Sequence, residues 1–90
     1  MPITQNHFSV GTVAVRVVAP DTMAQHVCIH NHEHSSNSTV YIGGENVTVN
    51  NGIHAAATTT SQLTIGPGDS LWAIADEEDC ELHILTVRQD

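Results

Sequence analysis

Residues that commonly bind metal ions alternate in one short segment of the chain. The segment carries four histidines and a cysteine at every second position: His26, Cys28, His30, His32 and His34. If the segment forms an extended strand, these side chains project from one face, with neighbouring members about 6.5–7 Å apart. Imidazole and thiolate groups are preferred ligands of Zn²⁺, and imidazole also binds iron. The spacing therefore marks these residues as candidate metal ligands.

The same histidines have other interpretations, which the sequence leaves open. Residues 31–38 are rich in turn-forming types, so the alternation need not persist as an extended strand. His30, His32 and His34 would then lie in a solvated loop or contact a partner. A contact that responds to pH is a third interpretation. In a trimer, by contrast, His30 and His32 of three copies could meet on the symmetry axis and supply six nitrogen ligands to Zn²⁺ or iron.

The elements that would position these residues are short β-type runs separated by turn residues. Apolar residues recur at every second position within the runs, and Gly, Pro, Asn and Asp fill the gaps between them. We expect strands at residues 10–19, 24–30, 39–42, 47–49, 62–65, 70–75 and 80–87. About seven short strands at this spacing predict an all-β fold, a small antiparallel β-sandwich or a jelly-roll-like barrel.

The chain is predicted to form a single small domain. Residues 1–8 are polar and unpatterned and are expected to form an N-terminal arm, while residues 9–90 form the sandwich. Residues 55–61 have no clear period and are expected to cross between the sheets. A 90-residue chain with one Trp, one Tyr and one Phe buries a modest core. We therefore expect a homo-oligomer, with a trimer favoured.

The charge balance limits the partners and the compartment. The chain has ten acidic residues, two arginines and no lysine, which gives a formal net charge of −8. It cannot neutralise phosphates, so we expect neither nucleic acid nor a membrane as a partner and favour a basic protein surface. The N-terminus lacks the features of a signal peptide, which predicts synthesis in a cytoplasm. Cys28 and Cys80 could pair, although a reducing compartment disfavours a disulfide.

Motifs of common enzyme classes are not found in the sequence. There is no nucleophile elbow, no phosphate-binding glycine loop and no lysine for covalent catalysis. A cupin-like metal site would need a Glu near positions 37 and 38, which are Asn and Ser, and a His sooner after Gly68 than His83. The acidic run 76–79 could bind Ca²⁺, but a solvated turn is more typical of such runs. We therefore predict no catalytic residues.

Turn-forming segments in the second half of the chain carry a resemblance to a known family. They read Thr39-Val-Tyr-Ile-Gly-Gly44, Val47-Thr48, Asn51-Gly52 and Gly66-Pro-Gly-Asp-Ser-Leu-Trp-Ala73. This block covers about half of the chain and resembles small structural proteins of tailed-phage virions, especially capsid decoration proteins of the β-sandwich type. Its turns are fixed by glycine, and Tyr41 and Trp72 would be aromatic anchors in adjacent strands.

The resemblance implies a decoration or minor capsid protein on the outside of a phage virion, assembled in the host cytoplasm. Its partner would be the major capsid protein, and each copy would stabilise the shell by clamping neighbouring coat subunits. The alternatives are a trimeric tail, fibre or spike component with a histidine-bound metal and, less favoured, a small cupin-like metalloprotein. The residues expected to contact a partner are His30, His32, His34, Tyr41, Trp72 and His83.

Overall fold

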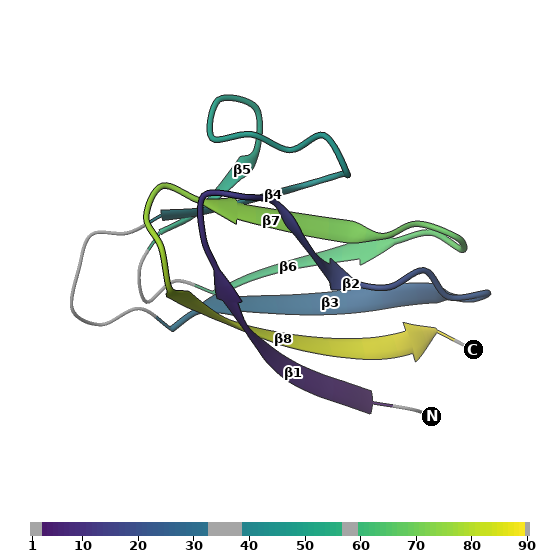
Figure 1. Cartoon of the computed structure of the whole chain (residues 1–90). Coiled ribbons are helices and arrows are strands. Elements are labelled where there is room, and N and C mark those ends of the chain that lie inside the picture. Colours follow the sequence, from purple (N-terminus) through teal and green to yellow (C-terminus); the bar gives the residue numbers. More distant parts are fainter. Residues whose placement is uncertain (1–2, 33–38, 57–59, 90) are drawn as a thin grey trace.

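The computed structural model describes residues 3–32, 39–56 and 60–89, which form two antiparallel sheets packed face to face (Figure 1). The strands are β1 (Ile3–Val10), β2 (Val15–Val18), β3 (Ala24–Asn31), β4 (Thr39–Gly43), β5 (Ile53–Ala56), β6 (Thr60–Ile65), β7 (Leu71–Ala75) and β8 (Cys80–Gln89). Sheet A has the order β1-β8-β3-β6 and sheet B the order β2-β7-β4-β5. Two four-stranded sheets connected in this way form a jelly roll, which confirms the predicted fold class.

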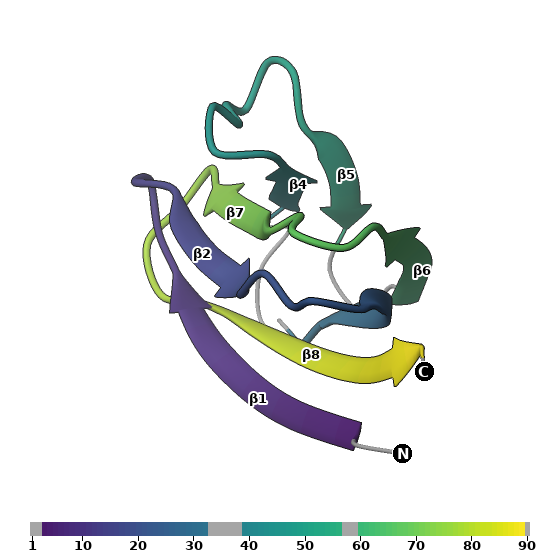
Figure 2. The same ribbon diagram turned by 90° about the vertical axis from the view of Figure 1, so that its right-hand side faces the viewer.

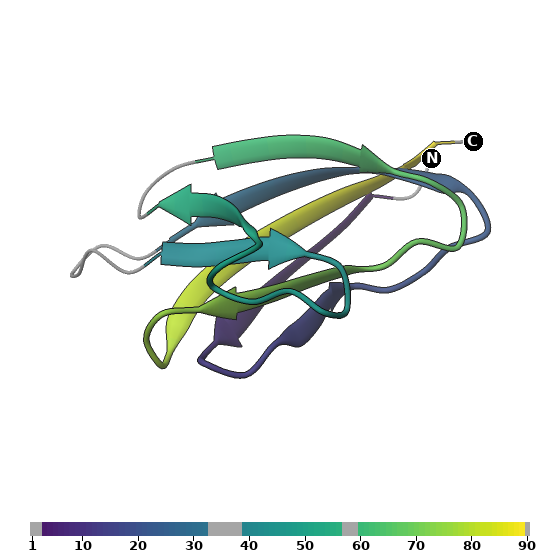
Figure 3. The ribbon, with the colours of Figure 1, turned by 90° about the horizontal axis from the view of Figure 1, so that it is seen from above.

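Most connections carry the chain from one sheet to the other. β4 and β5 are successive strands of the same sheet. Every other connection between successive strands joins the two sheets. Figure 2 shows the two layers edge on, and Figure 3 shows sheet B lying over sheet A. Strands that are neighbours in a sheet are therefore often distant in the sequence. The first strand, β1, pairs with the last, β8.

The hydrophobic core lies between the sheets and is built from alternate residues of each strand. In β3, Val27 and Ile29 are buried while His26, Cys28 and His30 face outward, as predicted. The core consists of Val10, Val17, Val18, Val27, Ile29, Val40, Ile42, Ile65, Leu71, Ala73, Ala75, Cys80, Leu82 and Ile84. Burying one large aliphatic side chain stabilises the fold by about 1.5–3 kcal/mol. This burial fixes which residues of sheet A face solvent.

The N-terminal segment differs from its prediction. From Ile3 onward, the residues expected to form an arm pair with β8 in an unbroken register that runs from Ile3↔Val87 to Val10↔Cys80. As an edge strand, β1 exposes most of its side chains, so it lacks the apolar alternation that identifies a strand. The single strand predicted over residues 10–19 is confirmed only for residues 15–18, which form β2; Val10 ends β1, and residues 11–14 connect the two strands.

The segment between β4 and the next strand was also predicted incorrectly. Residues 47–49 do not form a strand; they belong to a turn region in which the Val47 amide donates to the Gly44 carbonyl. The Gly52 amide donates to Thr48, and a Cβ added to Gly52 would lie 2.7 Å from the Cβ of Tyr41. The alternating valines here reflect a folded turn and not an extended chain. β5 follows it and pairs with β4.

The connection predicted over residues 55–61 was likewise wrong in part. Its first residues belong to β5 and its last residues begin β6, while residues 57–59 lie outside the described part of the chain. The turns predicted at residues 66–69 and 76–79 are confirmed. Of the loop expected over residues 31–38, Asn31 belongs to β3 and residues 33–38 lie outside the described part of the chain. In the β6–β7 turn, Gly68 has a φ of 81° and Asp69 donates its amide to Gly66. The described residues contain no helix long and apolar enough to cross a membrane.

Candidate functional site

Histidines from three strands lie side by side on the outer face of sheet A. The register pairs His7 of β1 with His83 of β8, and His83 with His30 of β3. Neighbouring strands lie about 4.8 Å apart, so paired side chains on one face reach each other. The ring centroids are 5.7 Å apart for His7 and His83 and 6.3 Å apart for His30 and His83. The row ends at β6, where Thr60 Oγ1 lies 3.0 Å from His30 Nδ1.

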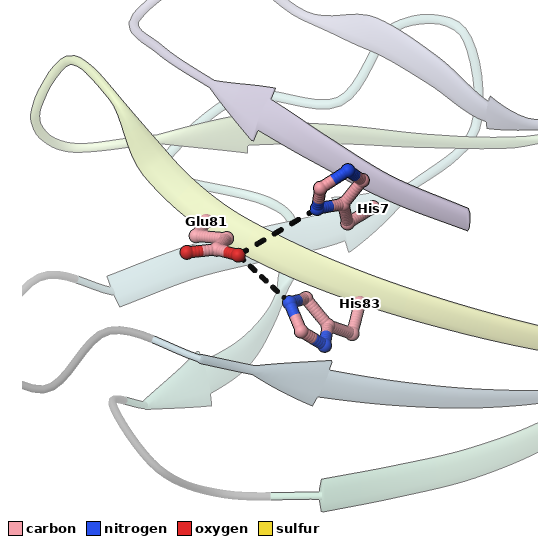
Figure 4. A network of polar contacts seen from close by, with 3 residues as sticks. All are labelled: His7, Glu81 and His83. Carbon is pink, nitrogen blue, oxygen red and sulfur yellow. Dashed lines mark hydrogen bonds and ion pairs between the residues drawn. The ribbon is translucent and has the colours of Figure 1, made fainter. Parts of the chain in front are cut away.

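A carboxylate lies beside this row. Glu81 precedes His83 by two positions on β8 and therefore shares its face. The imidazole of His83 donates from Nε2 to Glu81 Oε1 at 2.9 Å, and His7 Nδ1 lies 3.6 Å from the same oxygen (Figure 4). The hydrogen bond from His83 lowers the pKa of the Glu81 carboxyl, and His32 and His7 contribute in the same direction against the effect of desolvation. Glu81 is therefore ionised at neutral pH.

His32 extends the cluster beyond the end of β3. Its backbone amide donates to the Glu81 carbonyl at 2.9 Å, which holds the chain alongside β8 for one more residue. Its ring stacks on His83, with centroids 4.3 Å apart and an angle of 17° between the planes, and lies 5.5 Å from the ring of His30. The predicted alternation of His30 and His32 therefore persists in the fold. The structure brings both rings to His83.

His26 and Cys28, two further members of the predicted metal cluster, do not join this group. His26 lies further along β3, with its two ring nitrogens 3.2 Å from Thr64 Oγ1 and 3.1 Å from Gln62 Oε1. Cys28 is half-buried on the same face and is paired in register with Leu85. His34 lies outside the described residues.

The two cysteines do not form a disulfide in the structure. Cys28 faces outward from sheet A, whereas Cys80 is 1% exposed and belongs to the core. The Cys80 thiol donates to the Glu77 carbonyl at 3.5 Å. The thiols therefore lie on opposite sides of sheet A.

Tyr41 and Trp72 lie on sheet B, away from the histidine cluster of sheet A. They belong to β4 and β7, which are adjacent strands, as predicted. The Tyr41 ring contacts the ring of His54 edge on at 4.9 Å, and Trp72 Nε1 donates to Ser70 Oγ at 3.2 Å. Both aromatic residues alternate with buried neighbours and so face outward. The residues predicted to contact a partner, apart from His34, which the structure does not describe, are therefore divided between sheet A and sheet B.

Carboxylates of the acidic run at 76–79 accept hydrogen bonds from other segments of the chain. Asp76 accepts a hydrogen bond from the Thr39 amide, and Glu78 accepts hydrogen bonds from the amide and hydroxyl of Thr12 at 3.0 and 2.6 Å. The two bonds from Thr12 lower the pKa of the Glu78 carboxyl. These contacts give the carboxylates a role in closing one end of the sandwich.

Within the described residues, one group of three side chains has the geometry to hold a metal ion. His7, Glu81 and His83 each offer one ligand atom, and these atoms all lie within 4.8 Å of one another. The sequence predicted His83 as a contact residue but did not point to His7 or Glu81. No local motif joins them, because they meet through the pairing of the first and last strands.

Comparisons with known proteins find a solved structure of similar fold but no family. No protein-family model matches this chain, and no curated protein matches it. A solved chain from Bacillus endospore appendages, described as a novel family of disulfide-linked pili, has a similar fold, with a TM-score of 0.62 at 8% sequence identity. The match covers 99% of this chain and 87% of that chain. At this identity the similarity establishes the fold alone, and the resemblance to phage proteins stays a prediction.

Proposed function

We propose that this protein is a non-catalytic structural subunit of a multi-copy particle, and specifically a decoration protein on the outside of a phage capsid. It would bind the major capsid protein and neighbouring copies of itself, with a trimer favoured. The observation that carries this proposal is the exposed edge strand β1.

The β1 edge lacks the features that normally protect a sheet edge. Natural edge strands are kept apart by short length, bulges, proline or charged side chains. β1 has eight residues, reads Ile-Thr-Gln-Asn-His-Phe-Ser-Val, and pairs with β8 without a bulge. Ile3 at its start is 64% exposed. Such an edge is suited to pairing with a strand of a neighbouring subunit.

A second candidate contact lies at the opposite edge of the sandwich. β5 and β6 are the far edge strands of their sheets and lie close together (Figure 2). Between them is a mainly apolar hollow of about 230 Å³, and Ile53 at its rim is 73% exposed. The hollow is also lined by Ile29, Ile42, Leu63 and Leu71. Contact features on opposite edges would let one copy touch neighbours on both sides.

The charge of the chain supports a basic partner. At a formal charge of −8, with two arginines as its strong bases, the surface would be attracted to a positive patch on a coat subunit. A specific contact of standard size buries roughly 1,200–2,000 Å². A gain of a few kcal/mol per copy, repeated over a lattice, would resist rupture of the shell.

Particles assembled after deletion of this gene provide the test. The purified chain should bind to them in a fixed ratio, appear as added density on the shell, and raise the temperature at which they burst. An Ile3→Lys and Gln5→Lys double variant should occupy at least about tenfold fewer sites, because charged edges block strand pairing. Val13→Lys combined with Val49→Lys adds the same charge at positions outside β1 that are 75% and 41% exposed, and is the matched control. Particles that bind none of the parent protein would contradict the proposal.

A second candidate is a self-assembling appendage subunit, which the fold similarity to the endospore pili favours. In that case the purified chain should form filaments without any capsid. Cys28 would be the thiol for a disulfide between copies, because Cys80 is buried. Electron microscopy and non-reducing gels would detect such filaments and their loss in Cys28→Ser. Filaments formed by the chain alone would count for this candidate and against capsid decoration.

A further inference from the structure

We propose that His7, Glu81 and His83 form a binding site for one divalent transition-metal ion of the Zn²⁺ type. Two neutral imidazoles and one carboxylate are a ligand set that zinc uses where a further coordination position stays open. The site is assembled within a single chain and does not depend on the proposed assembly. It also differs from the trimeric His30 and His32 site predicted from the sequence.

The distances between the ligand atoms suit a small ion. In a tetrahedral zinc site with bonds of about 2.0–2.1 Å, ligand atoms lie roughly 3.3 Å apart. Glu81 Oε1 is 2.9 Å from His83 Nε2 and 3.6 Å from His7 Nδ1. All three atoms lie within 4.8 Å of one another. Small rotations of the side chains would bring them to tetrahedral spacing without movement of the strands.

The backbone already holds the ligands in place. His7 and His83 are register partners in β1 and β8, and β8 is an inner strand bonded on both sides. The ring of His83 is further restrained by stacking on His32. Binding requires the side chains to be ordered and the proton on His83 Nε2 to move to Nδ1, so that Nε2 offers a lone pair. It requires no movement of the strands, which reduces its entropic cost.

The site is open to solvent. The side chains of His7, Glu81 and His83 are 74%, 48% and 41% exposed. A hollow of about 340 Å³, lined in part by His7, Glu81 and Asp79, lies next to it. Water would have room to complete the coordination of the ion. The negative charge of the chain also favours a cation.

The test is metal binding by the full chain, purified without a histidine tag and stripped with a chelator. Titration with ZnCl₂ in a calorimeter, followed by elemental analysis after dialysis, should give about one tightly held ion per chain. His7→Ala and Glu81→Gln should each weaken its binding at least about tenfold, since even the loss of outer-shell partners costs 10–100-fold. Both positions are exposed, and thermal unfolding of the metal-free variants checks that the fold is kept.

Two control variants make the assignment specific. His26→Ala removes a histidine from the same face whose nitrogens contact β6 side chains instead, and should leave binding unchanged. His30→Ala combined with His32→Ala should weaken binding less than His7→Ala does. A parent protein that binds no zinc would overturn the proposal. Zinc binding that is unchanged in His7→Ala and in Glu81→Gln would also overturn it. The same holds if only the His30→Ala and His32→Ala double variant loses binding.

Discussion

His7 and His83 face each other across β1 and β8, with ring centroids 5.7 Å apart, although they lie near opposite ends of the chain. Their contact depends on the register of the two strands. A shift of one residue would turn every side chain of β1 to the other face of the sheet. The histidine cluster is therefore a property of the assembled sheet and not of any segment.

The register can be tested by exchanging neighbouring residues. The double change His7→Asn and Asn6→His keeps the composition of β1 but moves the imidazole opposite Ile84, on the other face. We expect zinc binding at the proposed site to weaken as much as in His7→Ala, measured by calorimetry. Equal zinc affinity in the exchanged chain and the parent would contradict a site that depends on which face of β1 carries the imidazole. Circular dichroism would check that the strands persist.

Glu78 should make the stability of the protein depend on acidic pH. Hydrogen bonds from Thr12 hold its pKa below the ordinary value of 4.5. The folded pKa is depressed, so this contribution to stability is present above the unfolded pKa and is lost as pH falls through the folded pKa. Below about pH 4.5 the melting temperature of Glu78→Gln should therefore fall less steeply than that of the parent.

A matched change at Glu45 supplies the comparison for this experiment. Glu45→Gln alters an exposed carboxyl in the β4–β5 connection and should follow the parent curve. Thermal scans of the three proteins from pH 6 to pH 3 are the measurement. Parallel curves for the parent and Glu78→Gln would contradict the role assigned to the contact between Thr12 and Glu78.

Leu82 should be among the most sensitive core positions. Its side chain, on the third residue of β8, is 0% exposed, so Leu82→Ala leaves a cavity between the sheets. We expect a loss of about 2–5 kcal/mol in the free energy of unfolding, measured by urea denaturation. Leu85→Ala, on the outer face of the same strand, should cost less because the site opens to solvent. A larger loss of unfolding free energy in Leu85→Ala than in Leu82→Ala would contradict the burial of Leu82 in the core.

Two glycines of the β4–β5 region should respond differently to alanine. A Cβ at Gly52 would lie 2.7 Å from Tyr41 Cβ and 2.8 Å from Val47 Cγ2, whereas one at Gly44 meets nothing within 4 Å. Gly52→Ala should destabilise the protein by about 1–3 kcal/mol through overpacking. Gly44→Ala should be close to neutral. Urea denaturation of both variants is the check, and equal stabilities would argue against the tight turn beneath Tyr41.

Much of the fold could be predicted because burial leaves a periodic trace in the sequence. Val27 and Ile29 in β3, and Leu82 and Ile84 in β8, alternate with outward residues and identify central strands. The β6–β7 turn could be predicted from its glycines and proline, because Gly68 adopts a positive φ that other residues rarely take. β1 left no such trace, because an edge strand is held by backbone pairing and needs few apolar side chains.

Only part of the candidate site could be predicted from the sequence. His30 and His32 were found because alternation is a local signal, and the structure keeps them on one face. His7 and Glu81 could not be found, because their proximity depends on pairing between the two ends of the chain. Long-range register is set by the packing of the whole sandwich, and a single sequence does not display it.

The pairing of Ile3 with Val87 places the start of the first strand beside the end of the last, as the N and C labels in Figure 1 indicate. Peptides fused to the two termini would therefore emerge as neighbours from one end of the sandwich. A short bridge joining the termini, with new ends opened beside Gly44, should give a circular permutant that folds. Such a permutant, checked by its melting curve, would make the sandwich a scaffold for displaying paired epitopes.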